Sequence, residues 1–212
     1  YGVGRLVESM RFISEDDIEQ AILAELDAEP FKYGIIKCSS DPNKRDDLND
    51  GTGRSSKKQC VLPDVLKKSL ARINPGIPQE RIERITKDLC QDFTGTDIVA
   101  TNYKLYRNIR DGIKISIRRN GKEDFDFVKL VDFDNPDNNT FTAVSQMWIQ
   151  GRVYYRRPDV IVFINGMPMV FIELKNSIVK VEEAYNTNLK NCLRDIPNLF
   201  AFNQICVLSN GL

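Results

Sequence analysis

Histidine is absent from the 212 residues of this chain. Its absence excludes the commonest general base, every Ser-His-Asp or Cys-His nucleophile system and every zinc site that requires imidazole. Any catalytic chemistry must therefore rest on carboxylates, lysine, tyrosine or cysteine. A strong charge of either sign is also missing, because 30 Lys plus Arg balance 30 Asp plus Glu. The balance argues against a surface that is basic all over, as a protein coating nucleic acid would have.

Paired cysteines and long apolar runs are missing as well. The five cysteines are spread through the chain, with no CxxC pair and no even set for disulfides. This usage is typical of a reduced, cytoplasmic protein. No run of about 18 apolar residues could span a bilayer, and the first residues do not form a signal-peptide pattern. We therefore expect a soluble protein with no membrane partner.

The hydrophobic fraction of 42% is enough for a real core. We expect one domain over residues 1–212. Because the chain begins at Tyr1 and stops just after an apolar segment, we also expect it to be a piece of a longer protein. Residues 38–60 are rich in Asp, Asn, Gly, Ser and Lys, which predicts an exposed polar loop.

Apolar periodicity predicts helices before strands. Ser14 is a candidate N-cap for a helix over residues 13–26, and prolines open two further helices at 63–73 and 78–89. Alternation from Ile113 onward and the pair Asn120-Gly121 predict a hairpin. The pattern indicates an α/β fold in which helices flank a mixed β-sheet. The later strands are expected within residues 125–133, 141–149, 160–164, 169–174 and 204–208, with a helix over 181–193.

The most informative stretch, residues 157–176, reads RPDVIVFINGMPMVFIELKN. Asp159 opens one apolar strand, Asn-Gly is typical of a tight turn, and a second apolar strand ends at Glu173, which predicts a hairpin with both acids at its open end. Two registers are possible. A two-residue loop places Asp159 opposite Ile172, whereas a longer loop or one bulge places it opposite Glu173. Directly opposite Cβ atoms lie about 5 Å apart.

Lys175 lies two residues beyond Glu173 and therefore projects from the same face. Two carboxylates this close repel unless a cation neutralises them. Oxygen-only ligation favours Mg²⁺, with Mn²⁺ as a substitute. The ion would activate a water and stabilise the phosphate, while Lys175 would orient or deprotonate the water or balance phosphate charge. The plainer alternative is that Asp159 and Glu173 merely end strands and pair with Arg156 or Arg157.

The arrangement resembles the PD-(D/E)xK signature of metal-dependent nucleases. The chain is similar over nearly its whole length, and most specifically from Val131 to Lys175, to the N-terminal nuclease domain of the restriction (R, or HsdR) subunit of type I restriction-modification enzymes. The resemblance implies a restriction-endonuclease-like core that hydrolyses phosphodiester bonds of double-stranded DNA with Mg²⁺. Other stretches that carry it are LKKSLARINPGIP from Leu66, VDFDNPDNNTF from Val131 and AYNTNLKNCLRDIPNLF from Ala184.

Roles of single residues follow from the same resemblance. It implies that Asp159 and Glu173 are metal-binding and catalytic acids and that Lys175 is the catalytic lysine. Glu19 matches a helix glutamate that faces the metal; the alternative is an exposed acid on an amphipathic helix.

The chain departs from the family at the QxxxY motif, where the nearest spacing gives Asn188 and Cys192, or Thr187 and Asn191 if no gap is allowed. Asn188 keeps an amide that could position a phosphate or the lysine, but Cys192 cannot imitate a tyrosine. Arg156 and Arg157 could grip a DNA backbone beside the site or could belong to a strand edge. Arg156, Arg157 and Asn188 are therefore candidate DNA-binding residues.

Partners are also implied by the resemblance. The family's R subunit joins methylation (M) and specificity (S) subunits, which supply sequence recognition, in the cytoplasm of bacteria or archaea. It continues into ATP-driven translocase domains that lie outside this chain, and the chain has no GxxxxGK[ST] loop, so ATP would act only through those domains. A different class of function stays open: a catalytically inactive module of the same fold that docks partner subunits or DNA.

Overall fold

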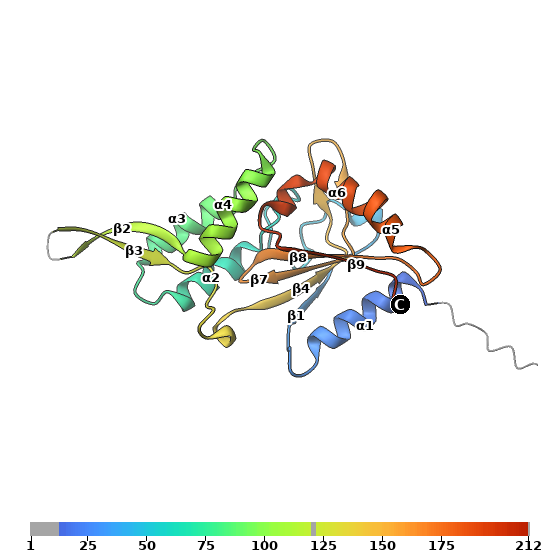
Figure 1. Ribbon diagram of the computed structural model, residues 1–212, viewed down its shortest axis with the longest axis horizontal. Coiled ribbons are helices and arrows are strands. Elements are labelled where there is room, and N and C mark those ends of the chain that lie inside the picture. Colours follow the sequence, from blue (N-terminus) through green and yellow to red (C-terminus); the bar gives the residue numbers. More distant parts are fainter. Residues whose placement is uncertain (1–12, 120–121, 212) are drawn as a thin grey trace, which may run out of the picture.

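The computed structural model describes residues 13–119 and 122–211 (Figure 1). Its centre is a five-stranded mixed sheet in the order β1-β4-β7-β8-β9. The two inner antiparallel pairs, β4 with β7 and β7 with β8, are flanked by parallel pairs at both edges. The strands are β1 (Gly34–Lys37), β4 (Phe141–Ser145), β7 (Val160–Ile164), β8 (Met167–Leu174) and β9 (Ile205–Ser209).

Helices cover both faces of this sheet (Figure 1). On one face lies α1 (Glu15–Asp27), whose Ser14 accepts a hydrogen bond from the Asp17 backbone amide in a capping box, as the sequence predicts. On the other face the helix predicted over 181–193 runs as three pieces in succession. These are α5 (Val181–Glu183), a π-helical segment (Ala184–Leu189) and α6 (Lys190–Asp195).

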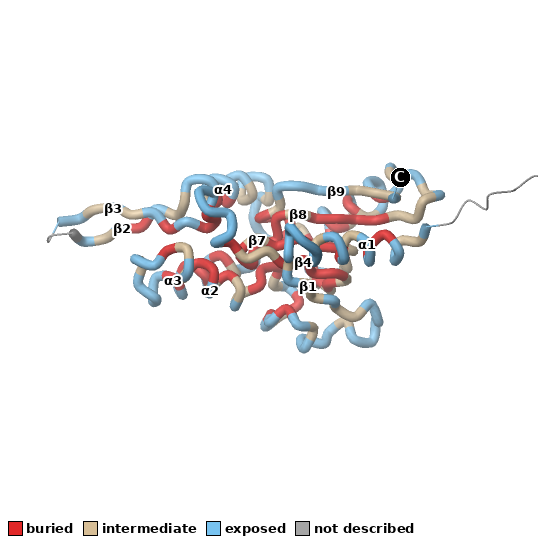
Figure 2. Tube along the Cα trace, turned by 90° about the horizontal axis from the view of Figure 1, so that it is seen from below, coloured by how far each residue is buried: buried red, intermediate tan, exposed pale blue. Residues whose placement is uncertain are grey.

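The apolar run of β7 is explained by these two layers. Val160 and Val162 pack in the cluster that contains residues of α1, whereas Ile161 and Phe163 pack in the cluster that contains residues of α6. A strand buried on both faces reads as continuous apolar sequence rather than as alternation. Figure 2 shows a continuous buried stretch along β8, while β9 is more exposed.

A second group of elements extends from the sheet (Figure 1). It consists of helices packed beside a hairpin of β2 and β3, and the Asn120-Gly121 turn predicted there lies outside the described residues. The helix α4 was not predicted, although Asp97 caps its start.

The predicted strand over 141–149 ends earlier than expected, because β4 stops at Ser145. The remaining bounds are α2 (Pro63–Ile73), α3 (Gln79–Leu89), α4 (Ile98–Asp111), β2 (Ile113–Arg119), β3 (Lys122–Val128), β5 (Ile149–Gln150), β6 (Tyr155–Arg156), and 3₁₀ turns at Pro42–Lys44, Pro136–Asn138 and Pro197–Ala201.

The prediction that residues 38–60 are exposed is wrong for part of the second half of the segment. Asp50, Arg54 and Lys57 are buried there, with side chains 8%, 0% and 5% exposed. The Asp50 carboxylate lies 2.9 Å from Arg54 Nη2 and 2.7 Å from Lys57 Nζ. Arg54 also donates to the Trp148 carbonyl at 3.1 Å. The cluster therefore fastens the loop to the segment that follows β4.

Among residues 13–119 and 122–211, no helix has both the length and the apolar character needed to cross a membrane.

Candidate active site

The hairpin of β7 and β8 decides between the two registers left open by the sequence. Ile164 pairs with Met167 and Phe163 with Pro168, as a two-residue turn requires. A bulge then shifts the register, so that Val160 pairs with Ile172. Asp159 precedes Val160 and Glu173 follows Ile172, so the two acids come to the same level at the open end. The bulged alternative is the one that occurs.

Pro168 gives a physical reason for the bulge. Proline has no N–H to donate to a strand ladder and is therefore restricted within sheets to edges, strand starts and bulges. The strand β8 lies inside the sheet, between β7 and β9. The register shift falls directly beyond the Phe163–Pro168 pair and leaves Met169 as the extra residue. The bulge beside Pro168 thus sets the position of Glu173, five residues further along β8.

Asp159 is held from two sides. Its Oδ2 accepts the backbone N–H of Leu174 at 2.7 Å, which joins the two strands at the open end. Its backbone carbonyl accepts the N–H of Gln146 at 2.9 Å. Burial raises the pKa of Asp159, and the hydrogen bond from Leu174 acts in the opposite direction.

Glu173 is buried, with 4% of the residue exposed. Burial raises its pKa, and the neighbouring Asp159 carboxylate raises it further. Lys175 Nζ lies 3.9 Å from Glu173 Oε1 and donates to the Leu174 carbonyl at 3.0 Å. Glu173 and Lys175 therefore project to one side, as their spacing predicts. The structure brings the two acids and the lysine together.

Glu19 is not the exposed acid of the alternative interpretation, since only 5% of it is accessible. Burial raises the pKa of its carboxyl, and Asp159 contributes to the shift. The amide of Gln146 lies between the two groups: its Nε2 donates to Glu19 and lies 3.4 Å from Asp159 Oδ1. Within the part of the chain that is described, no three His, Cys, Asp or Glu side chains converge as metal ligands.

The arginine partners proposed in the plainer alternative lie elsewhere. Arg156 binds Asp195 through Nη2 at 2.5 Å and Nε at 2.8 Å. The Arg157 guanidinium donates to the Ser40 carbonyl and lies 5.1 Å from the Trp148 ring centroid. Asp159 and Glu173 are thus not strand-end acids neutralised by these arginines.

Asn188 comes from the π-helical segment and contacts the site directly. Its amide donates to Glu173 Oε1, so it serves an acid rather than the lysine. A cavity of about 420 Å³ adjoins Glu173 at this point. All three candidate DNA-binding residues line it. Its walls include Ser40, Trp148, Tyr155, Arg156, Arg157, Asn188 and Asn191.

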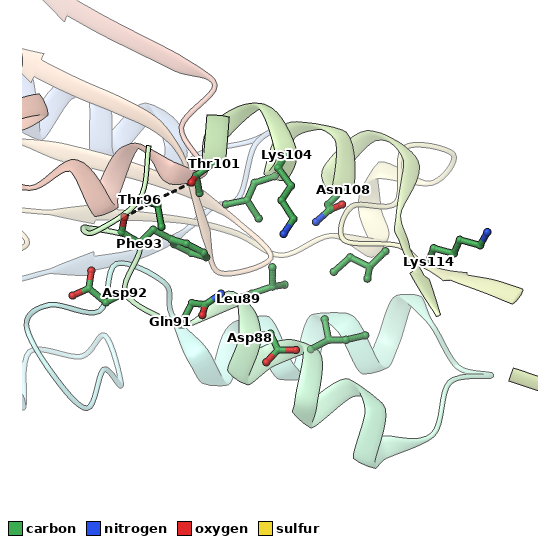
Figure 3. Close-up of a pocket in the computed structure, with 13 residues that line it drawn as sticks. Asp88, Leu89, Gln91, Asp92, Phe93, Thr96, Thr101, Lys104, Asn108 and Lys114 are labelled. Carbon is green, nitrogen blue, oxygen red and sulfur yellow. Dashed lines mark hydrogen bonds between the residues drawn. The ribbon is translucent and has the colours of Figure 1, made fainter. Parts of the chain in front are cut away.

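A larger cavity of about 530 Å³ lies between α3, α4 and the start of β2 (Figure 3). Figure 3 shows Lys104 and Asn108 on one wall and Asp88 on the other. None of the residues lining this cavity is a predicted site residue. Of the predicted catalytic residues, Glu173 lines the smaller cleft.

Gln146 is the site residue that sequence reasoning missed. A signal was present: the polar pair Ser145-Gln146 interrupts the largely apolar segment FTAVSQMWI. Its importance depends on contacts with Glu19, 127 positions away, and with Asp159. Such contacts follow from the packing of α1 against the sheet, which local pattern does not give.

The mixed sheet and the bulged hairpin with its two acids and lysine define a restriction-endonuclease-like α/β fold. The family model for the N terminus of the type I restriction enzyme R protein matches residues 12–212. The chain therefore belongs to this family.

Two relatives agree with this assignment. The type I restriction enzyme HindI endonuclease subunit of Haemophilus influenzae is 30% identical over 94% of this chain and 19% of its own length. A sequence from Methanocaldococcus jannaschii named "Putative type I restriction enzyme MjaIXP endonuclease subunit" is 32% identical over 75% of this chain and 16% of its own length. The chain thus spans about a fifth or less of these relatives.

Proposed function

We propose that this chain is the Mg²⁺-dependent nuclease domain of a type I restriction enzyme R subunit, and that it hydrolyses phosphodiester bonds of double-stranded DNA without sequence specificity of its own. The observation that carries the proposal is the bulge in the β7–β8 hairpin. It places Asp159 and Glu173 at one level and leaves Lys175 beside them. A single shift of register would send the acids to opposite faces of the strands.

The donor set fits a hard dication. Asp159 and Glu173 supply carboxylate oxygens, and the Asp159 carboxylate disfavours the charged form of Glu173, so a cation between them would relieve that repulsion. Two carboxylates suit Mg²⁺ in particular, because it usually binds few protein ligands and keeps several waters. Mn²⁺ is the expected substitute. When bound, the ion would supply an activated water and charge stabilisation at the phosphate.

The remaining groups would orient the substrate. Lys175 presents an ammonium on the side of Glu173 and can hold a phosphate oxygen or take part in proton transfer to or from water. Asn188 fixes the Glu173 carboxylate from the helical layer. Arg157 and Tyr155, on the same cleft, can contact the DNA backbone, which carries affinity without sequence information.

Other subunits and domains of the enzyme would supply sequence recognition and translocation, which this chain lacks. The two relatives are named as endonuclease subunits of type I restriction enzymes. We propose the same assembly here, with methylation and specificity subunits as partners and ATP-driven translocation performed by the remainder of the R subunit. In such an assembly, a weak and sequence-blind grip on DNA is sufficient for the nuclease domain.

Metal binding by the 212-residue chain tests the proposal against the inactive docking module. Titration calorimetry with Mn²⁺ should show a saturable site in the wild type that is lost in Asp159→Ala, because half of the carboxylate pair is gone. Asp134→Ala is the matched control, since its carboxylate is exposed and pairs with Lys129. Equal heats from the wild type and Asp159→Ala would support the docking module instead.

A further inference from the structure

The backbone of Gln146 has an unusual conformation. Its φ is +56°, in the left-handed region that glycine adopts freely and other residues adopt rarely. The residue directly follows β4. Within residues 13–119 and 122–211 the only other non-glycine residues with positive φ are Lys32 and Asn165. Glycine would satisfy the backbone here, so the presence of glutamine points to a use for the side chain.

The side chain of Gln146 joins two acids that come from different layers. Its Nε2 donates to Glu19 Oε2 on α1 and lies 3.4 Å from Asp159 Oδ1 before β7. Both partners are acceptors, so only the nitrogen end of the amide can serve them, and the orientation of the amide is fixed by its surroundings. The backbone N–H of Gln146 donates to the Asp159 carbonyl as well.

Together with the Leu174 backbone, Gln146 contacts both oxygens of the Asp159 carboxylate. Leu174 N–H holds Oδ2 at 2.7 Å, and the Gln146 amide faces Oδ1. Without the amide, Glu19 and Asp159 would meet as two like charges in a buried position. Glu19 in turn holds the Gln146 amide in place, and it does not converge with Asp159 and Glu173 as a third acid among the described residues.

We propose that Gln146 is a positioning residue of the metal site and that Glu19 acts through it rather than as a ligand of the ion. The chain of contacts runs from Glu19 to Gln146 to Asp159, and it orients the aspartate that binds the cation. Partners of this kind typically change metal affinity by about 10- to 100-fold when they are removed. The inference rests on the proposed function, because it concerns the same cation.

Mn²⁺ affinity and thermal stability, measured together on the 212-residue chain, test this role. In Gln146→Gly the Mn²⁺ affinity should fall by about 10- to 100-fold, whichever way the melting temperature moves, because glycine relieves the backbone strain but leaves Glu19 and Asp159 facing each other as buried acids. A merely structural glutamine would lower the melting temperature and leave the affinity unchanged. Lys32→Gly is the matched control: its φ is +50°, it is exposed, and its Mn²⁺ affinity should equal that of the wild type.

A second variant covers the case in which the glycine variant does not fold. Gln146→Asn keeps an amide and tolerates positive φ, but it is one methylene too short to bridge the two acids, so it should show the same loss of affinity. Unchanged Mn²⁺ affinity in either folded variant would overturn the inference.

A double-variant comparison separates positioning from direct ligation by Glu19. Glu19→Gln alone should weaken Mn²⁺ binding, and adding it to Gln146→Gly should weaken binding no further, because both act along one chain of contacts. Losses that add would show that Glu19 meets the ion itself and would overturn the proposal. A wild type with no Mn²⁺ site dependent on Asp159 would instead refute the proposed function, so the two failures are distinguishable.

Discussion

Lys175→Met is expected to reduce strongly the rate of DNA cleavage by the type I restriction enzyme that we propose for this chain. The substitution removes the ammonium beside Glu173 and keeps the length and apolar stem of the side chain. Preorganised charge in a buried site is worth roughly 10²- to 10³-fold in rate for a single group, so cleavage should fall by at least about 100-fold. The measurement is the rate at which circular DNA is cut in the presence of Mg²⁺ and ATP.

The control variant is Lys180→Met, which removes an exposed lysine of the same chain and should cut at the wild-type rate. ATP consumption during translocation should continue in both variants, because the proposed assembly assigns it to domains outside this chain. Near-normal cutting by Lys175→Met would contradict the nuclease assignment. Loss of both cutting and ATP consumption would instead indicate failed assembly.

The sequence was informative about this site because chemistry and register are both local there. The motif names Asp159, Glu173 and Lys175 directly, and the turn leaves only two registers. Pro168 could have decided between them, since a proline inside a sheet favours a bulge. Pro168 favours a bulge only if β8 is an inner strand, and its place between β7 and β9 is known only from the structure.

Other parts of the site could not be predicted because they depend on packing between distant segments. Gln146 matters through a helix more than a hundred residues away. The helix α4 begins with Ile98-Val99, and β-branched residues of this kind weaken a helical signal. The polar composition of residues 38–60 correctly predicts a loop, yet it also predicts exposure. Charged residues are rarely buried unless they are paired with an opposite charge. Here Asp50, Arg54 and Lys57 of the same loop pair with one another.

Asp50→Asn should therefore be the substitution in this loop that most destabilises the fold. It preserves shape and the hydrogen bond from Thr52, but it leaves Arg54 and Lys57 buried without a counter-charge. Removing one partner of a buried ion pair costs about 3–5 kcal/mol. For a domain of this size each kcal/mol shifts the melting temperature by about 2–4 °C, so thermal unfolding should show a decrease on the order of 10 °C.

The destabilisation caused by Asp50→Asn should depend on pH, because the wild-type Asp50 carboxylate itself titrates. Burial alone would raise the pKa of Asp50, but Lys57, Thr52 and Arg54 outweigh burial and lower it to about 2, from 3.8 in the unfolded chain. The stabilisation is therefore fully present above about pH 4 and disappears as the pH falls toward 2; the shift corresponds to roughly 2 kcal/mol. The stability gap between the wild type and Asp50→Asn should narrow over that interval. Asp46→Ala is the control, because Asp46 pairs with Arg45 at the surface and should change the free energy of unfolding by less than about 1 kcal/mol. A gap that stays constant from pH 5 to pH 2 would contradict an ionised, buried Asp50.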